Sequence, residues 1–243
     1  MSQIITTLKN VIVNESFNVA DYPSCKFFLP VTETSGLVLH DLVGDQDLTF
    51  SGLIDSVFTF SGGAATVVGS VGISSAGTET LPDLGSTQDF VQLVVADYPT
   101  DNRSVRIGST ASESIRAFRK SGTGKSAILD VTPTTTTFAA DTSVDGNTQA
   151  LAIVTDRAAP NETSIIETDG TTVTTGSAIT LTATAGINLN SGIFYVDESI
   201  SLYGSATFLF DSIPADVEAA VSWMNYQWRN GNKVLYPPWR YMT

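Results

Sequence analysis

The last fifty residues constrain the fold more than any other stretch, because they hold the one clear helical pattern in the chain. Asp211 and Ser212 offer an N-cap before Pro214, which the first turn of a helix tolerates. Asn230 and Gly231 predict the end of the helix. The apolar residues at helical spacing are Ile213, Val217, Ala220, Val221, Met224 and Trp228. We therefore expect one amphipathic helix closing an otherwise all-β chain.

The rest of the chain is a series of short strand-like runs separated by Gly, Asn and Asp turns. The runs Phe90–Ala96 and Gln149–Thr155 are mostly apolar, which predicts central strands buried on both faces. Asp169 and Gly170 stand between two alternating runs, which favours a hairpin with a type I′ turn. This density of strands predicts an antiparallel jelly-roll sandwich of two sheets with one C-terminal α-helix.

Composition limits the classes of partner. The chain has 243 residues, enough for a full β core, and 12 basic against 25 acidic residues give a net charge of −13. That charge disfavours nucleic acid and anionic membranes. The first ten residues have no signal-peptide pattern, and no apolar run reaches the length of a membrane helix. A single cysteine, Cys25, excludes an intramolecular disulfide, and its apolar neighbours predict a buried side chain.

Two motifs suggest catalysis but lack required residues. Gly122–Ser126 resembles part of a phosphate-binding loop, but the glycine needed five residues before the Gly-Lys pair is Arg119. We therefore expect a hairpin loop. Glu167 and Asp169 have the spacing of a glycosidase pair, but the third carboxylate position is Thr172. An Asp-Gly turn would also point these carboxylates at solvent. The sequence thus predicts a protein that is not an enzyme.

Metal chemistry has few candidate ligands. His40 is the only histidine and fits a polar turn, so a zinc site is not predicted. We expect no cofactor, with Ca²⁺ left open at two acidic turns. One covers residues 41–47, and the other holds Asp97, Asp101 and Asn102.

Aromatic residues gather at the C-terminus. They are Trp223, Trp228, Tyr236, Trp239 and Tyr241, and Arg229, Lys233 and Arg240 stand among them. The helical position of Trp228 favours core packing. Pro237 and Pro238 precede Trp239, so this segment either folds back over a sheet, which we favour, or docks on another subunit. The candidate assembly residues are Trp228, Tyr236, Trp239 and Arg240.

Three pieces resemble the laminin-G-like members of the concanavalin A-like lectin and glucanase superfamily. They are the strand, acidic turn and short strand of Phe27–Gly52, the central strand and hairpin of Leu151–Val173, and Ile200–Gly204 with the strand and helix that follow. The resemblance implies a jelly-roll sandwich over residues 21–231, after an N-terminal strand or arm at 1–20 and before an aromatic tail at 232–243. It also implies a glycan or protein ligand, and sometimes calcium. The segment 230–239 is similar to the C-termini of such domains in bacteriophage structural proteins.

Three functions follow. The first is a non-enzymatic structural protein of a phage particle, made without export, located in the virion on capsid or tail, and contacting itself or other virion proteins through its terminal segments. The alternative is a module that binds host surface polysaccharide in an exposed groove around Tyr98, Asp101 and Asn102. The third is a glycoside hydrolase, which needs paired carboxylates that the sequence does not clearly supply.

Overall fold

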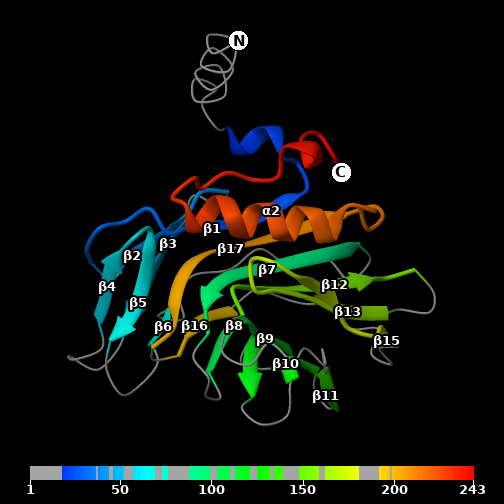
Figure 1. Cartoon of the computed structure of the whole chain (residues 1–243), viewed down its shortest axis with the longest axis horizontal. Coiled ribbons are helices and arrows are strands. Elements are labelled where there is room, and N and C mark those ends of the chain that lie inside the picture. The colour runs from blue at the N-terminus through cyan, green and yellow to red at the C-terminus, as the bar shows by residue number, and fades with distance from the viewer. Residues whose placement is uncertain are drawn as a thin grey trace.

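Over the residues that it describes, the computed structural model of the chain is a sandwich of two antiparallel β-sheets with one α-helix on its outer side (Figure 1). This confirms the predicted fold class. The structure describes residues 18–36, 38–43, 46–51, 57–68, 73–75, 88–98, 103–109, 113–120, 125–131, 134–138, 148–158, 162–180, 192–197 and 199–243. The predicted N-terminal arm lies mostly outside these residues. No helix in the described ranges is long and apolar enough to cross a membrane.

The first sheet has nine strands in the order β14-β13-β12-β7-β17-β5-β4, with β1 also pairing β17 and β15 pairing β13. Its strands are β1 Cys25–Pro30, β4 Val57–Ser61, β5 Ala64–Val68, β7 Asp89–Asp97, β12 Ala150–Asp156, β13 Glu162–Thr168, β14 Val173–Thr175, β15 Ile179–Thr180 and β17 Ser201–Phe210. Both runs predicted to be central, β7 and β12, lie inside this sheet and are almost continuously buried.

The second sheet has eight strands in the order β11-β10-β9-β8-β16-β6-β3-β2. Its strands are β2 Val38–Asp41, β3 Gln46–Ser51, β6 Ile73–Ser75, β8 Arg103–Ser109, β9 Glu113–Lys120, β10 Lys125–Val131, β11 Thr134–Phe138 and β16 Gly192–Val196. The strands β16 and β17 are neighbours in sequence but belong to different sheets. The chain therefore crosses between the two layers just before its longest strand.

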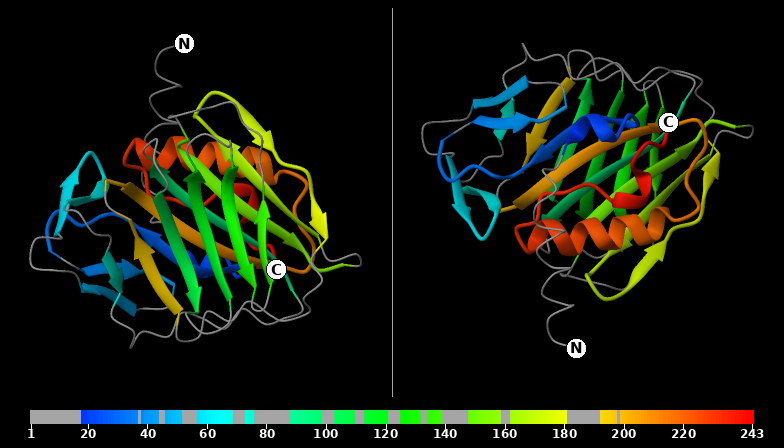
Figure 2. Two further views of the ribbon diagram at one scale, coloured as in Figure 1. Left: turned by 90° about the horizontal axis from the view of Figure 1, so that it is seen from below. Right: turned by 90° about the horizontal axis from the view of Figure 1, so that it is seen from above.

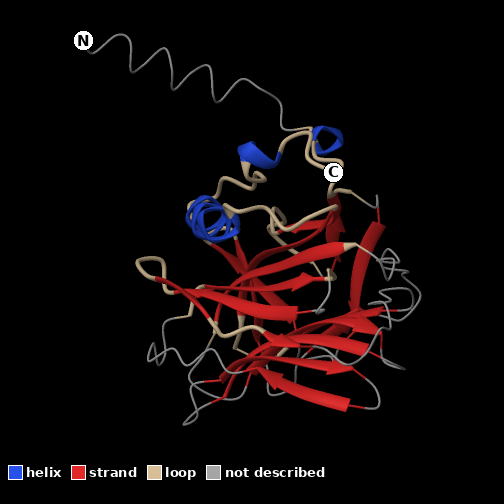
Figure 3. Ribbon diagram, turned by 90° about the vertical axis from the view of Figure 1, so that its right-hand side faces the viewer, coloured by secondary structure: helices blue, strands red, loops and turns tan. Residues whose placement is uncertain are grey.

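The nine-stranded sheet is buried on both faces because each face packs against a different layer (Figures 2 and 3). Strand β1 shows the alternation. Phe27 points into the core between the sheets, and Phe28 points into a second core beneath the helix and the C-terminal segment. Strand β7 divides in the same way, with Val94 in the first core and Val95 in the second.

The helix α2 spans Val217–Arg229 and covers the outer face of this sheet. The residues that it buries are Ala220, Val221, Met224, Asn225 and Trp228, which confirms the predicted apolar face from Ala220 onward. Of the other predicted members, Ile213 precedes the helix and Val217 is half-buried. The predicted start is wrong. The N-cap is Asp216 instead of Asp211 or Ser212. The C-terminal prediction holds, since Asn230 is the C-cap and Gly231 follows with φ of 84°. Two 3-10 turns flank the domain, η1 Val19–Asp21 and η2 Pro237–Trp239.

The predicted hairpin at Asp169 and Gly170 exists, but its turn differs from the expected type. Thr168 pairs with Val173, which leaves four residues in the loop. Gly170 has φ of 88°, whereas Asp169 is not among the residues with positive φ, so the turn is not type I′. The Asp169 carboxylate instead accepts hydrogen bonds from the backbone N–H groups of Thr171 (2.8 Å) and Thr172 (2.7 Å). A side chain thus closes this loop.

An Asp169→Asn variant is expected to be less stable than the parent chain near neutral pH, with the difference vanishing in acid. The N–H groups of Thr172 and Thr171 lower the pKa of the Asp169 carboxyl. A carboxyl with a folded-state pKa below its unfolded value of about 3.9 adds stability above that value and loses it as the pH falls through the folded pKa. Melting temperatures of both chains from pH 7 down to pH 2 would show this convergence. A constant difference over the whole range would contradict it.

Candidate functional site

A polar hollow of about 260 Å³ lies beside the C-terminal end of α2. Its lining residues are Gln149, Gly170, Tyr203, Asn225, Tyr226, Arg229 and Asn230. Four come from the last turns of the helix and its C-cap, and the others come from the start of β12, the β13–β14 loop and β17. Amide, guanidinium and phenol groups therefore meet here from four separate segments.

Two amide side chains form the inner wall of the polar hollow. Asn225 is 1 % exposed, and its Nδ2 donates to Gln149 Oε1 at 3.2 Å. The side-chain oxygen of Asn225, Oδ1, is buried and has no hydrogen-bond partner among the described residues. Gly170 presses against the same glutamine, since a Cβ at that position would lie 2.4 Å from Gln149 Oε1. The hairpin loop thus holds Gln149 in place.

A triad of Asp97, Arg229 and Tyr203 adjoins the hollow, and its Arg229 and Tyr203 line it. Arg229 Nη1 lies 2.6 Å from Asp97 Oδ1, and the Arg229 guanidinium carbon lies 4.4 Å from the centre of the Tyr203 ring. The Tyr203 hydroxyl donates to Asp97 Oδ2 at 3.1 Å. Burial, followed by the Asp97 charge, raises the pKa of Tyr203, so the phenol stays protonated as a donor. The triad presents a fixed, paired set of charges at the hollow.

Tyr226 stands at the rim and is 65 % exposed. An exposed tyrosine offers a ligand both an apolar ring and a polar hydroxyl. The hollow therefore combines a solvent-facing ring, two oriented amides and a paired arginine. This set can hydrogen-bond a polyhydroxylated ligand and pack against its apolar face.

The predicted groove around Tyr98 needs correction. Tyr98 is 3 % exposed and belongs to the core between the sheets, so its ring cannot face a surface groove. Burial raises the pKa of its hydroxyl. Asp101 and Asn102 lie outside the described residues. Asp97, from the same predicted turn, does not line the polar hollow but contacts Arg229 and Tyr203, which do.

The aromatic C-terminal residues lie within the fold. Trp228 and Trp239 are both fully buried in the second core, as the favoured fold-back predicts. Tyr236 is partly buried against Trp239, with ring centres 5.7 Å apart. Arg240 is exposed and forms an ion pair with Asp21. The two tryptophans are therefore core residues, and their own chain already covers the surface they would offer a subunit.

Glu167 and Asp169, which have the spacing of a glycosidase pair, do not both face solvent. Glu167 is 3 % exposed on β13, and its Oε1 accepts a hydrogen bond from the Thr148 hydroxyl. Asp169 is bound to its own turn. Neither carboxylate lines the polar hollow. The prediction that the chain is not an enzyme stays a prediction.

The other residues considered in the sequence analysis are a hairpin loop, a histidine and a cysteine, and the structure places them as follows. Strands β9 and β10 pair antiparallel on either side of residues 121–124, as a hairpin requires. His40 is an exposed residue of β2 instead of a turn residue. Cys25 is buried, as predicted, and burial raises the pKa of its thiol.

In the first acidic turn considered for Ca²⁺, the Asp41 carboxylate already accepts hydrogen bonds within the fold. Its Oδ1 accepts from the backbone N–H groups of Phe28 and Val43, each at 3.0 Å. Asp97 is bound to Arg229 and Tyr203. Residues 44 and 45, and the Asp47 side chain, lie outside the description. Within the described ranges, no group of three or more His, Cys, Asp or Glu side chains could hold a metal ion.

The sequence predicts none of the residues that line the polar hollow as binding residues, and Gln149, Asn225 and Tyr226 show why. No motif links them, because they lie up to 77 positions apart and meet only when α2 packs on the sheet. One signal was available. Asn225 interrupts the apolar face of the helix next to Met224, and a polar residue on a buried face needs a partner.

No family model matches the chain, and comparison with curated proteins finds no match. Among solved structures, the chain is similar to the botulinum neurotoxin serotype D binding domain, with a TM-score of 0.53 and 9 % identity over 86 % of this chain. The chain spans 51 % of the length of that structure. This likeness concerns the fold alone. The resemblance predicted from the sequence holds at that level, an all-β sandwich, and no family model assigns the chain to the laminin-G-like group.

Two weaker similarities were also found. One is to the CBM2 module of the evolved Dit of Lactobacillus casei BL23 phage J-1, with a TM-score of 0.47, 12 % identity, and coverage of 79 % of this chain and 97 % of that one. The other is to the binding domain of botulinum neurotoxin DC in complex with SialylT, with a TM-score of 0.48, 10 % identity, and coverage of 86 % and 52 %.

Proposed function

We propose that this chain is a carbohydrate-binding domain whose site is the polar hollow at the C-terminal end of α2. The observation that carries the proposal is the buried, unpartnered carbonyl oxygen of Asn225 beside the exposed ring of Tyr226. A buried acceptor without a donor is unfavourable, and a ligand hydroxyl would satisfy it. The ring of Tyr226 offers an apolar surface for the C–H face of a pyranose.

The remaining groups of the hollow suit the same class of ligand. Sugar hydroxyls both donate and accept hydrogen bonds, and Gln149 and Asn230 provide both functions. Arg229 is already paired with Asp97, so the hollow holds no free cation aimed at an acidic ligand. A neutral sugar unit is therefore the best match.

The first function that the sequence predicts is a structural protein of a phage particle, with carbohydrate binding as its alternative. Its expected contact surfaces are the N-terminal arm, which lies mostly outside the described residues, and the aromatic C-terminus, whose Trp228 and Trp239 are buried inside the fold. A virion location, contacts with other virion proteins or self-assembly, and the phage connection stay predictions. They are compatible with carbohydrate binding, since a particle protein can carry a glycan site.

The test is a polysaccharide and glycan array probed with the full chain, followed by titration of the strongest ligand. A Tyr226→Ala variant is expected to bind about tenfold more weakly, which corresponds to about 1.4 kcal/mol. Loss of the ring removes its contact area without disturbing the core, because the side chain is exposed. Isothermal titration calorimetry would measure the change.

Tyr241 provides the matched control, since it is 68 % exposed and lies outside the polar hollow. Tyr241→Ala should bind as the parent chain does. Equal binding by both variants would contradict the proposed site, and no binding to any glycan would contradict the proposed function. Repeating the array with a chelator would show whether Ca²⁺ takes part.

A further inference from the structure

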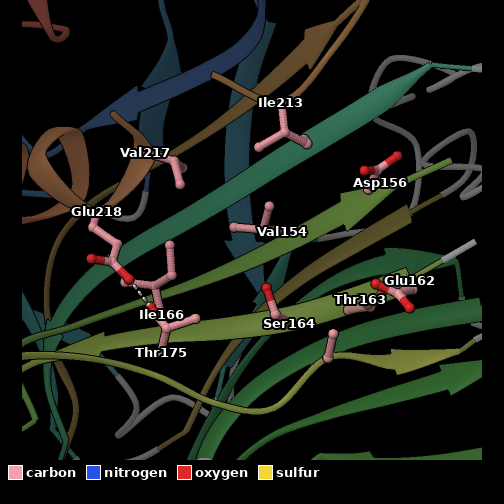
Figure 4. Close-up of a pocket in the computed structure, with 11 residues that line it drawn as sticks. Val154, Asp156, Glu162, Thr163, Ser164, Ile166, Thr175, Ile213, Val217 and Glu218 are labelled. Atoms are coloured by element: carbon pink, nitrogen blue, oxygen red, sulfur yellow. Dashed lines mark hydrogen bonds between the residues drawn. The ribbon is translucent and has the colours of Figure 1, made fainter. Parts of the chain in front are cut away.

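A second hollow lies at the other end of α2, where the segment leading into the helix crosses β12 and β13 (Figure 4). We call it the acidic groove, and its volume is about 260 Å³. Its floor is apolar and consists of Val154, Ile166, Ile213 and Val217. Val154 and Ile166 are buried, and Ile213 and Val217 pack against the second core. The floor is therefore a fixed part of the fold.

Three carboxylates line the acidic groove: Asp156, Glu162 and Glu218. Figure 4 shows Glu218 at one end and Asp156 with Glu162 at the other, with the apolar side chains between them. Asp156 and Glu162 are direct partners across the β12–β13 ladder. Like charges placed opposite each other on neighbouring strands are unfavourable, so a cation between them would relieve repulsion.

These carboxylates have no basic partner in the described part of the chain. The Glu162 carboxylate forms no hydrogen bond or ion pair there, and Asp156 Oδ1 only accepts from the N–H of Ala158 at 2.8 Å. Glu218 accepts from the Thr175 hydroxyl. No lysine or arginine lines the groove. The described residues contain no cluster suited to a metal ion, so the matching ligand is an elongated organic cation.

We propose that the acidic groove receives one lysine or arginine side chain of a partner protein. The methylene stem of such a side chain would lie on the apolar floor, and its charged head would reach Asp156 and Glu162. A hollow of about 260 Å³ has room for one extended side chain. The net charge of −13 would also attract a basic partner surface.

The test uses the full chain labelled for NMR and the peptide acetyl-Gly-Arg-Gly-amide, compared with its citrulline counterpart. Citrulline keeps the size and polarity of arginine without the charge. We expect the arginine peptide to bind at least about tenfold more tightly and to shift the signals of Val154 and Val217. The affinity should fall as salt is added, because exposed charges are screened.

Glu162→Gln should weaken binding of the arginine peptide about three- to tenfold. Glu33→Gln is the matched control, because it removes the same charge from a loop outside the groove. Equal binding of the arginine and citrulline peptides would overturn the proposal. Equal losses of peptide affinity in the two variants would also overturn it, because they would show that only the net charge of the chain matters. Binding of free agmatine as tight as the peptide would overturn the assignment to a partner protein.

This inference is independent of the carbohydrate site at the other end of the helix. Tyr226→Ala should leave peptide binding unchanged, and Glu162→Gln should leave glycan binding unchanged. A Tyr226→Ala effect on the peptide would contradict the placement in the acidic groove.

Discussion

Replacing Trp239 with alanine is expected to lower the free energy of unfolding by about 3–5 kcal/mol. Trp239 is fully buried and packs edge-on against Phe208 and Phe210, with ring centres 4.9 Å and 5.1 Å apart. Its indole N–H donates to Asp216 Oδ1 at 3.0 Å. Truncation would leave a cavity under the C-terminal segment and remove the partner of the helix N-cap.

Urea denaturation would measure this loss, with Trp223→Ala as the matched control. Trp223 is only partly buried, and its described ring contact is with Tyr236 at 5.7 Å. The control should therefore lose much less stability. Trp239→Phe should fall between the two, since it keeps an aromatic ring but loses the hydrogen bond to Asp216.

This experiment also separates the two interpretations of the aromatic C-terminus. If Trp239 contacted another subunit, Trp239→Ala would change the oligomeric state and leave the stability of the isolated chain near that of the parent. Light scattering with the urea titration would show which occurs. Unchanged stability together with lost oligomers would contradict the core role assigned here.

Replacing Lys233 with methionine is expected to lower the free energy of unfolding by about 2–4 kcal/mol. Lys233 Nζ donates to three backbone carbonyls: those of Gly63 (2.7 Å), Tyr203 (2.9 Å) and Trp228 (2.7 Å). These belong to the β4–β5 turn, to β17 and to the end of α2. An ammonium group has three N–H donors, so one side chain satisfies all three acceptors. Methionine keeps an apolar stem and leaves the carbonyls without this donor.

The measurement is best made near pH 6.5, because burial, followed by the nearby Arg229 charge, lowers the pKa of Lys233 to about 8. At that pH the ammonium keeps its three protons. Lys26→Met is the matched control, since Lys26 Nζ donates to a single carbonyl, that of Pro23, at 2.7 Å. Comparable losses in the two variants would argue against the three-way clamp.

The helix was the most predictable element because its signal is local. Ala220, Val221, Met224 and Trp228 repeat with helical spacing, and all four are buried. Its start was not predictable. Asp211, Ser212 and Asp216 are equally suitable caps in sequence, and the position of Trp239 decides how the Asp216 side chain is used.

The carbohydrate site could be predicted only in fragments. The sequence singles out the acidic residues on either side of Tyr98, and one of them, Asp97, contacts Arg229 and Tyr203, which line the polar hollow. Tyr98 was misplaced because alternation along an extended chain does not say which face is covered. As a result, Asp97 has a side chain at the surface, whereas the next residue, Tyr98, lies in the core.

The sequence by itself determined the class of fold, the two central strands, the buried face of the one helix and the existence of the hairpin at Gly170. These depend on hydrophobic periodicity and turn chemistry, which act over a few residues. Only the tertiary structure decided that α2 lies across the nine-stranded sheet, with a polar hollow at one end and an acidic groove at the other. Those sites join side chains from distant segments, such as Gln149 with Asn225, and packing between layers is what brings them together.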